Sequence, residues 1–560
     1  MSQVKQDGND VNPFLVSIKS PVSNQMASIY MVRLAELRPH VLASAAKAMA
    51  HSPDKITYCE RIIKLKRGTG LCLIVGILFK ELKKRPKLLA QYHKKAGKAI
   101  AAPLPPAGSC ILAPTKNEQG AIETKDGALP EYYSPADLVF LEDESGRVGL
   151  TGNVETTGLV SGIALAIIGE SVTGETFQVS RICHVGFAPC PIPMPIYSCT
   201  TKSTKAKNPV IVFLSGLRIR NSSSETCAYL SKLGKTIQSL LERFKLVRVI
   251  IAGDSLNITT LPIVPLSIKP VQHVEPSLVK SLYSQDKPSK PDKSDKLSKS
   301  DKSGKIEKKH KSKYVDDDDD DECMSIGTKL KPTTPLQLFD AWLESTSRIT
   351  SIDLLPGYMD PTNHALPQQP FDACLIPKAL TTGRVHTFTN PCVMRINECL
   401  LYGNSGQPIL DLYTFCDSKM VTRSSTSSTS ISSTTATTLD ASISSKTAEP
   451  RDPRDPSIAY MEATLVWRHM APTMPDSLAC LHVGGNKDHF IFKTTPHIYF
   501  AGNQPRFASS TVRSTCINNS NRELQEVTCR LISIPAVQQS NSLVVFNLVD
   551  YSCISIDLLK

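Results

Sequence analysis

Apolar residues in the first third of the chain recur first at helical and then at strand-like intervals. Between residues 29 and 37 they keep close to the helical spacing and Pro39 follows, so we predict a short amphipathic helix that ends at this proline. Five apolar runs come next, separated by glycine and acidic turns. They cover residues 72–79, 138–141, 148–150, 163–169 and 177–182. These runs predict five strands, with a hairpin turn at residues 142–147.

The middle of the chain alternates between strand and helix patterns. A buried strand is predicted at residues 210–214, a helix whose apolar face extends over residues 230–244, and a second strand at residues 247–254. Thr334-Pro335 has the form of a helix start, and a third strand follows at residues 349–355. Such a series predicts parallel strands with right-handed crossovers, whose carboxyl-terminal ends line a cleft.

The last part of the chain is patterned mostly as strands. We predict them at residues 463–466, 490–492, 497–500, 527–534 and 543–548. The predicted fold class is α/β plus β, in which a β-barrel of the OB type is joined to a two-layered α/β sandwich with a β-rich second half. The predicted boundaries are an N-terminal segment with the short helix at residues 1–50, the barrel at 51–200 and the α/β domain at 205–560.

Two low-complexity inserts interrupt the predicted α/β domain. In the first, at about residues 283–323, lysine recurs every third residue and an unbroken run of aspartates follows at residues 316–321. The second, at residues 422–449, holds 18 Ser or Thr among 28 residues. Neither has an apolar face to bury, so we predict disorder in both. Because loop closure costs only ~0.6 kcal/mol per doubling of length, we expect the fold to tolerate their replacement by short linkers.

Composition excludes several classes of protein. A chain of 560 residues with 41% hydrophobic and 21% charged residues predicts a folded protein of more than one domain. The sixteen cysteines include no C-x-x-C pair and the first twelve residues are polar, which indicates reduced thiols, no zinc and no secretory leader. The longest uncharged apolar run, residues 158–169, is far below the ~20 residues of a membrane helix. We expect a soluble nuclear or cytosolic protein, and residues 308–313 have the form of a nuclear import signal.

The net charge of +12 invites a nucleic-acid interpretation, but the excess is spread along the chain. The insert at residues 286–322 carries 11 lysines and 12 acidic residues, which gives 11 − 12 = −1. Basic residues cluster only at residues 80–98. The aromatic residues on the predicted barrel strands are Phe79, Phe140 and Phe177. We place these rings in the core, so a protein-binding barrel is favoured over one that binds single strands.

The loops after the predicted strands hold the candidate site. Six positions in these loops are candidates, although their residue types are largely wrong for holding metals. They are Ser215, Gly216, Asp254, Asn257, Asp360 and Asn503. A hard cation or zinc held by the one retained acid, Asp254, would lack both charge and ligand count. We therefore predict no catalytic, cofactor-binding or metal-ligating residue, and we expect Asp360, Asn363 and His364 to form a structural hydrogen-bonded loop.

Seven short segments carry a family resemblance. They are residues 37–40, 75–80, 141–144, 361–370, 403–407, 468–476 and 497–505. In this order they resemble the small (B) subunits of the DNA polymerase alpha, delta and epsilon family. The string Asp-Pro-Thr-Asn at 360–363, with Leu-Pro-Gln-Gln-Pro at 366–370, resembles the delta branch of that family.

The resemblance implies an OB fold joined to a calcineurin-like metallophosphoesterase sandwich that lacks its metal ligands. Active phosphoesterases carry D-x-H, G-D-x-x-D, G-N-H-D/E and G-H-x-H motifs, whereas here Ser215-Gly216-Leu217, Asp254 with Asn257, Asp360 and Asn503 stand at those places. The implied function is a non-catalytic scaffold of DNA polymerase delta in the nucleus, for DNA replication and repair, without a cofactor.

The resemblance also implies partners. They are the cysteine-rich C-terminal domain of the catalytic subunit of DNA polymerase delta, a third accessory subunit, the sliding clamp indirectly, DNA through the complex, and DNA polymerase zeta. Two alternative functions stay open at this point. One is a residual metal-dependent phosphoesterase that works through Asp254 and Asp360; the other is an autonomous single-stranded DNA-binding protein that uses the barrel and residues 83–95, with affinity that falls steeply with salt.

Overall fold

The structure is a computed structural model that describes residues 12–16, 26–50, 55–68, 70–85, 130–190, 207–257, 334–396, 398–421, 455–481, 487–517 and 524–558. All of these residues belong to one compact unit. The two inserts and the basic cluster at 308–313 lie outside the described residues, so what we expect of them stays a prediction, as do the domain boundaries. Within the described part, no helix has both the length and the apolar character that crossing a bilayer requires.

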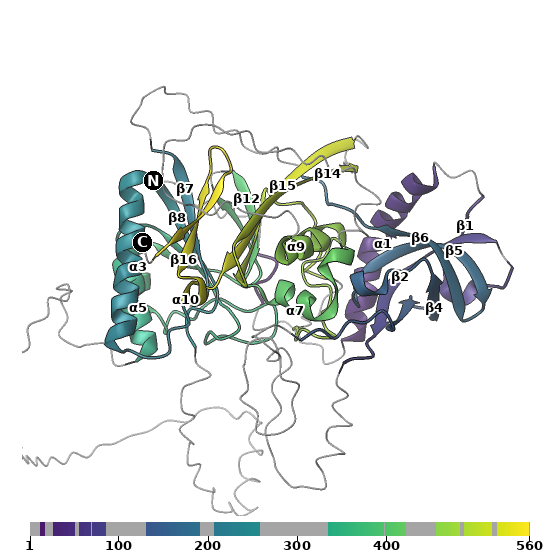
Figure 1. Cartoon of the computed structure of the whole chain (residues 1–560), viewed down its shortest axis with the longest axis horizontal. Coiled ribbons are helices and arrows are strands. Elements are labelled where there is room, and N and C mark those ends of the chain that lie inside the picture. Colours follow the sequence, from purple (N-terminus) through teal and green to yellow (C-terminus); the bar gives the residue numbers. More distant parts are fainter. Residues whose placement is uncertain are drawn as a thin grey trace, which may run out of the picture. The chain divides into compact units, whose positions relative to one another are not determined.

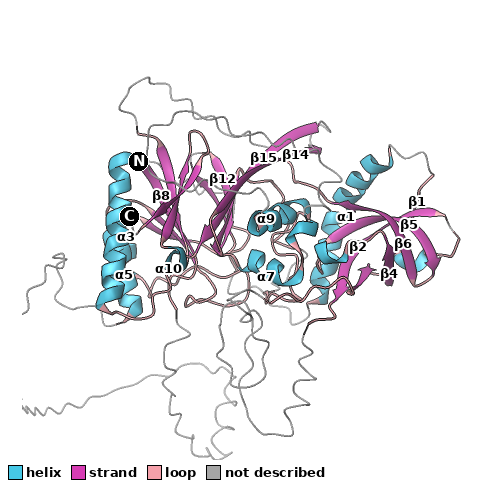
Figure 2. Cartoon of the chain, in the orientation of Figure 1, coloured by secondary structure: helices cyan, strands magenta, loops and turns pink. Residues whose placement is uncertain are grey.

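A six-stranded sheet forms the predicted barrel (Figures 1 and 2). Its elements are β1 (Thr57–Tyr58), β2 (Leu71–Glu81), β3 (Leu138–Glu142), β4 (Arg147–Gly152), β5 (Ala164–Thr173) and β6 (Thr176–His184), with 3-10 turns η1 (Ile62–Lys64) and η4 (Thr156–Gly158). The strand order is β1-β2-β3-β4-β6-β5, and an additional pairing of β2 with β5 closes the barrel. The five predicted strands are confirmed, as is the hairpin, in which Glu142 pairs with Arg147.

Strand β2 is apolar along almost its whole length because both of its faces are covered. Cys72, Ile74 and Leu78 belong to the core inside the barrel, whereas the alternate residues Leu73 and Val75 pack against a helix outside it. A strand that is buried on both faces needs no polar alternation. This explains the continuous apolar run in the sequence.

The helix outside the barrel, α1 (Ala27–Met49), is longer than predicted because it continues through Pro39. The prediction that it ends at this proline is wrong. A proline inside a helix costs roughly 3 kcal/mol, but Val41 and Ala45 beyond it are fully buried against the barrel together with Leu37 before it. Burial of apolar side chains on both sides of the proline offsets that cost.

Two further sheets build the rest of the described chain. The first contains β7 (Pro209–Leu214), β8 (Lys245–Ala252), β9 (Ile352–Leu355), β10 (Val385–Thr387), β16 (Ser542–Asn547) and β17 (Cys553–Asp557), in the order β10-β9-β8-β7-β16-β17. The second contains β11 (Cys392–Ile396), β12 (Cys399–Asn404), β13 (Ile498–Gln504), β14 (Ala508–Ile517) and β15 (Leu524–Pro535), in the order β11-β12-β13-β15-β14. Strands β7, β8 and β9 are parallel, as predicted, and β10, which was not predicted, joins β9 in parallel.

The two sheets pack face to face with helices on their outer faces. The helices are α3 (Ser224–Arg243), α5 (Pro335–Ser347), α6 (Pro377–Thr381), α7 (Gln407–Phe415), α9 (Pro456–Val466) and α10 (Val537–Ser540). Val210 and Val212 of β7 belong to the core under α3 and α5, whereas Ile211 and Phe213 belong to the core between the sheets. The predicted two layers are therefore too few, because a strand pattern in the sequence does not reveal which sheet the strand joins.

Two predicted strands in the last part of the chain are wrong. Residues 463–466 end helix α9, and residues 490–492 form only an isolated bridge between Ile491 and His469. Helix α9 is buried on all sides, so its short apolar run shows no helical period. The better signal was its start, where Asp455 caps the helix and Pro456 occupies the first turn.

Two buried basic side chains connect the barrel to the second half of the chain. Lys80 of β2 pairs with Asp137 at 3.5 Å and donates hydrogen bonds to the carbonyl oxygens of Leu159 and Phe415, each at 3.2 Å. Burial lowers the pKa of Lys80, and Asp137 opposes that shift. The ammonium group therefore depends on a partner and two carbonyls that only the folded chain supplies.

Arg33 of α1 makes more hydrogen bonds across this connection than Lys80 does. Its Nε donates to Asp488 Oδ2 at 2.8 Å, and Nη1 donates to the carbonyl oxygens of Gly162 at 2.8 Å and Pro472 at 2.9 Å. Nη2 donates to the carbonyl of Met474 at 3.1 Å, and the side chains of Arg33 and Asp488 are both 0% exposed. One guanidinium group thus joins α1, the barrel and the second half.

Replacement of Arg33 by Met is expected to lower the free energy of unfolding by ~3–5 kcal/mol, because Asp488 would remain buried without its partner. Arg33→Lys is expected to restore little, because an ammonium group lacks the planar fork that reaches four acceptors. Urea unfolding measures both. The matched control is Arg38→Met on the same helix, where the partner Glu144 is 48% exposed and the loss should stay below ~1 kcal/mol. Equal effects of the two Met variants would contradict this role of Arg33.

Candidate functional site

The six candidate positions meet at one edge of the paired sheets, where the loops after β7, β8 and β9 approach β12 and β13. All six are buried there. The Gly216 amide donates to the carbonyl of Gly253 at 2.9 Å, and the Asn503 amide donates to Ser215 Oγ at 3.0 Å. Asn257 closes the same cluster, with its amide bonded to the carbonyl of Ile219 at 3.1 Å. The sequence thus located a real convergence of loops.

Several residues of this cluster have left-handed backbone conformations. The φ angles are +64° at Gly216 and +81° at Gly253, but also +47° at Arg218, +54° at Asp254 and +53° at Asn503. Such angles are uncommon for residues with a side chain and carry a conformational cost. The surrounding hydrogen bonds must therefore hold these loops in place.

Asp254 is fully engaged by the protein. Its Oδ1 accepts the amide of Met359 at 3.1 Å, and its Oδ2 lies 3.6 Å from Nη2 of Arg218. Burial raises the pKa of Asp254, while Arg218 and the backbone amides of the next loop oppose that shift. The guanidinium group of Arg218 is thus the positive charge closest to this carboxylate.

Both carboxyl oxygens of Asp360 accept hydrogen bonds from the backbone. Its Oδ1 accepts the amide of Leu256 at 2.8 Å and its Oδ2 accepts the amide of Gly357 at 2.7 Å. Burial, followed by the neighbouring charge of Asp254, raises the pKa of Asp360 to about 8. The raised pKa favours the protonated form of Asp360 at neutral pH.

This donor set does not fit a two-metal centre. Both carboxyl groups accept hydrogen bonds from the backbone. The side-chain nitrogen Nδ2 of Asn503 donates to the carbonyl of Ser405 at 2.9 Å. The loops are also too close, because a Cβ at Gly357 would overlap the backbone nitrogen and Oδ1 of Asp254. Among the described residues, no three His, Cys, Asp or Glu side chains gather so that they could hold a metal ion. The arrangement has the chemistry of a packed hydrogen-bonded core.

Sequence reasoning missed Arg218, although it lies only two residues beyond Gly216. Its side chain is 8% exposed and its backbone amide donates to the carbonyl of Asp254 at 2.9 Å. A basic residue in a loop that otherwise suggested a metal site was the available signal, because a fixed cation beside Asp254 competes with a metal ion for the same charge.

A second network that the sequence did not reveal lies beside the first. Asn390 Nδ2 donates to Gln368 Oε1 at 2.7 Å and to Ser405 Oγ at 2.6 Å, and Gln368 donates to the carbonyl of Gly357 at 2.9 Å. Gln407 completes the network through its contacts with Ser405 and Gln368. Hydrogen bonds between amide side chains from distant positions thus connect the loop after β9 to the start of α7.

The predicted loop network of Asp360, Asn363 and His364 is only partly as expected. Asn363 donates to the carbonyl of Ala365 at 2.6 Å and accepts the amide of Gln369 at 2.7 Å, which supports a structural role. The partners of Asp360 are different, and the ring of His364 lies beside Tyr358 with 5.6 Å between centroids. The three residues therefore do not form one network.

The barrel aromatics are also only partly as predicted. Phe177 is fully buried, but Phe79 and Phe140 are half-buried and the guanidinium carbon of Arg147 lies 4.7 Å and 5.1 Å from their ring centroids. Placing these two rings in the core was wrong, because their positions on paired strands face away from it. Arg147 is in turn ion-paired to Glu142.

Part of the basic region near the barrel is also engaged within the chain. Nη1 of Arg85 lies 3.1 and 3.0 Å from the two carboxylate oxygens of Asp476. Residues 86–95 lie outside the described part. Arg85 therefore holds the barrel to the second half instead of standing free for a nucleic acid.

The contribution of Asp360 to the free energy of unfolding is expected to fall as the pH rises from about 4 to 8, because the pKa of Asp360 is about 8 in the folded chain and 3.8 ordinarily. The protonated form stabilises the fold below this window, and each pH unit within it removes up to ~1.4 kcal/mol. Asp360→Asn cannot ionise, so its stability relative to the natural chain should rise across the window. Denaturant unfolding at several pH values measures the difference, and parallel curves for the two chains would contradict a buried, protonated Asp360.

Comparison with known proteins agrees with the barrel and the loops. A family described as DNA polymerase delta subunit OB-fold domain matches residues 25–182, and one described as the B subunit of DNA polymerase alpha/epsilon matches residues 305–509. The DNA polymerase delta small subunit of Oryza sativa subsp. japonica is 24% identical over 94% of this chain and 92% of its own length. Those of Arabidopsis thaliana and Saccharomyces cerevisiae are 25% and 24% identical over 94% and 96% of this chain, and over 90% and 91% of their own lengths.

These matches confirm the family resemblance found in the sequence, and they extend over both the barrel and the paired sheets. The chain belongs to the B-subunit family of DNA polymerases, and over nearly its whole length it is similar to the delta small subunits.

Proposed function

We propose that this chain is a non-catalytic scaffold subunit of DNA polymerase delta, acting in DNA replication and repair. The observation that carries the proposal is the similarity to delta small subunits over 94% of the chain. The buried connections through Arg33 and Lys80 support a scaffold, because they join the barrel and the paired sheets into one body that can hold other proteins in a fixed arrangement.

The paired sheets are, on this proposal, an inactive member of the calcineurin-like metallophosphoesterases. Parallel strands that end in loops with Asp254 and Asp360 support the descent, and the engagement of both carboxyl groups by backbone amides supports the loss of metal binding. The left-handed residues in these loops are then retained for packing, since each loop now bonds to the next.

The partners that fit this function are the cysteine-rich C-terminal domain of the polymerase catalytic subunit and a third accessory subunit. The sliding clamp and DNA would be reached through the complex, and DNA polymerase zeta is a further candidate that could share this subunit. The place of action on this proposal is the nucleus. Similarity to proteins named as small subunits of a polymerase supports these assignments.

The full-length chain is expected to co-purify with the catalytic subunit of DNA polymerase delta from the same organism when the two are co-expressed. Size-exclusion chromatography of the affinity-purified complex measures this association. The variant Asp254→Asn, tested beside the natural chain, should assemble equally well, because the partners of the Asp254 carboxylate are Met359 and Arg218 of the same chain. Elution of the two proteins in separate peaks would contradict the proposed function.

The same preparations test the two alternative functions. Hydrolysis of an aryl phosphate with added Mn²⁺ should be no faster with the natural chain than with Asp254→Asn, because both carboxyl groups are held by backbone amides of the chain. An activity lost only in the variant would establish a phosphoesterase instead. Retention of single-stranded DNA by the isolated chain at physiological salt, lost on Arg147→Ala between Phe79 and Phe140, would establish direct DNA binding.

A further inference from the structure

Helix α1 presents apolar residues on the side that faces away from the barrel. Leu34 and Leu37 pack on the barrel, but Met31 is 36% exposed and Ala35 is also exposed. An exposed methionine with small neighbours is a common feature of protein-binding surfaces, because its flexible thioether adapts to a partner.

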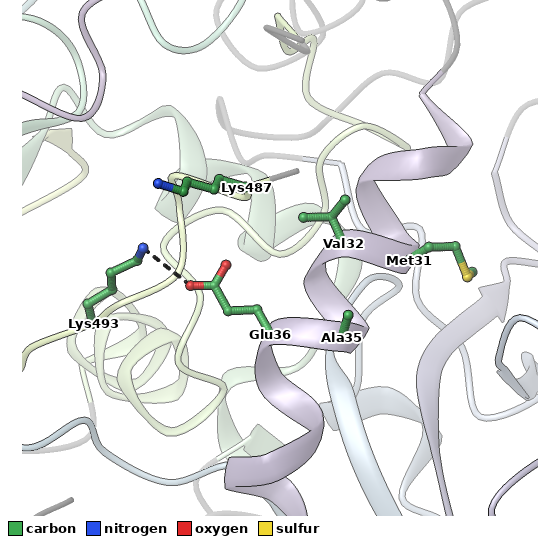
Figure 3. Close-up of a pocket in the computed structure, with 6 residues that line it drawn as sticks. All are labelled: Met31, Val32, Ala35, Glu36, Lys487 and Lys493. Carbon is green, nitrogen blue, oxygen red and sulfur yellow. Dashed lines mark ion pairs between the residues drawn. The ribbon is translucent and has the colours of Figure 1, made fainter. Parts of the chain in front are cut away.

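A groove lies along this side of α1 (Figure 3). Met31, Val32, Ala35 and Glu36 line it from the helix, and Lys487 and Lys493 line it from the opposite side. Figure 3 shows the two lysines across from Val32 and Glu36, with Met31 and Ala35 on the adjoining side of the helix. We call this hollow the α1 groove.

The apolar surface continues beyond the α1 groove through Lys487. A second hollow shares this lysine and is lined by Leu15, Val16, Ile29 and Leu481 among others, and Leu15 is 55% exposed. The α1 groove is thus one end of a longer apolar strip with a basic edge.

The strip is preformed, because the segment at residues 14–16 that borders it is held in place by contacts with the rest of the chain. Phe14 is 2% exposed and its ring lies tilted against that of Phe490, with 5.5 Å between ring centroids. Gln369 accepts the amide of Val16 at 3.0 Å and donates to the carbonyl of Phe14 at 3.0 Å. A surface that is fixed before binding loses little conformational entropy when a partner docks.

The charges around the groove are predominantly positive. Lys487 is exposed and forms no ion pair with another residue in the described ranges. Lys493 pairs with Glu36 at 3.4 Å, but its side chain is 60% exposed, so the pair is weak and exchangeable. Asp488, the other acid nearby, is buried in its contact with Arg33 and contributes no surface charge. The groove is therefore complementary to an acidic partner.

We infer that the α1 groove docks an amphipathic helix of another polymerase subunit, which sets an apolar row against Met31, Val32 and Ala35 and acidic side chains against Lys487 and Lys493. This inference rests on the proposed function, since it locates one surface by which the scaffold holds its partners. Helices bind such grooves through residues spaced three and four apart, and the charged edge then fixes their direction.

The experiment compares Ala35→Glu with Ala43→Glu in the full-length chain. Both positions are exposed on α1 and both receive the same side chain, but only Ala35 lines the groove. Each variant is co-expressed with the catalytic and accessory subunits of the same organism, and biolayer interferometry of the purified chain against each subunit gives the Kd. Ala35→Glu should weaken binding of one subunit about tenfold or more, whereas Ala43→Glu should leave it unchanged.

Charge variants give an independent reading. Lys487→Glu should weaken binding of the same subunit and reduce its salt dependence, whereas Lys235→Glu, an exposed lysine on α3, should not. Glu36→Gln frees Lys493 from its ion pair and should leave the affinity equal or a few-fold tighter. Far-ultraviolet circular dichroism and the thermal midpoint, unchanged in all five variants, show that the fold is intact.

The outcomes separate this inference from the proposed function. Suppose that the natural chain binds the polymerase subunits, and that the variants Ala35→Glu and Lys487→Glu bind these subunits as tightly as their control variants do. The groove assignment is then wrong, and the proposed function stands. If the natural chain binds neither of these subunits, both fall. If Ala35→Glu changes only the mass of the isolated chain in light scattering, from a dimer to a monomer, then the groove holds a second copy of this chain and the inference is overturned.

Discussion

The buried guanidinium group of Arg33 is the interaction on which the arrangement of the described chain depends. It satisfies Asp488 and three carbonyl oxygens that come from the barrel and from the second half. Burial raises the pKa of Asp488, but His469 and Arg33 lower it by more, so the pKa ends below its ordinary value. Burial lowers the pKa of His469 to about 4, so this ring is neutral at pH 7 and Arg33 supplies the charge that balances Asp488. Each group is stable in the interior only because the others are present.

The same requirement explains why the loops at the strand ends are no longer suited to metals. A carboxyl group that leaves water must find hydrogen-bond donors, a counter-charge or a proton. Asp254 has Arg218 and a backbone amide, and Asp360 has two amides and a raised pKa. Once the protein itself provides these partners, a cation would have to displace them to bind these carboxyl groups. A site of this kind contributes stability and rigidity, which are the properties that a scaffold needs.

The sequence predicted the elements whose signal is local and missed those decided by tertiary packing. The five barrel strands and the parallel β7, β8 and β9 follow from apolar runs with clear boundaries, and all six site positions do converge. The extension of α1 past Pro39 depends on Val41 and Ala45 finding the barrel, which no local rule reveals. Helix α9 was mistaken for a strand because burial on all sides erased its period. Arg218 contacts Asp254, 36 residues further along the chain, and Asn390 contacts Gln368, 22 residues before it. A single sequence does not show such contacts.

The central claim is that the strand-end loops are packed into a rigid scaffold and that partners bind elsewhere on its surface. Hydrogen exchange by mass spectrometry on the full-length chain, alone, with Mn²⁺ and with the polymerase subunits, tests it most directly. The account predicts that amides at residues 253–257 and 357–360 exchange slowly in all three conditions, because they lie in a hydrogen-bonded network of largely buried residues. It predicts new protection on assembly at residues 28–36 and 487–493. Fast exchange in the loops that slows only when Mn²⁺ is added would contradict it, since the loops would then be an unfilled metal site.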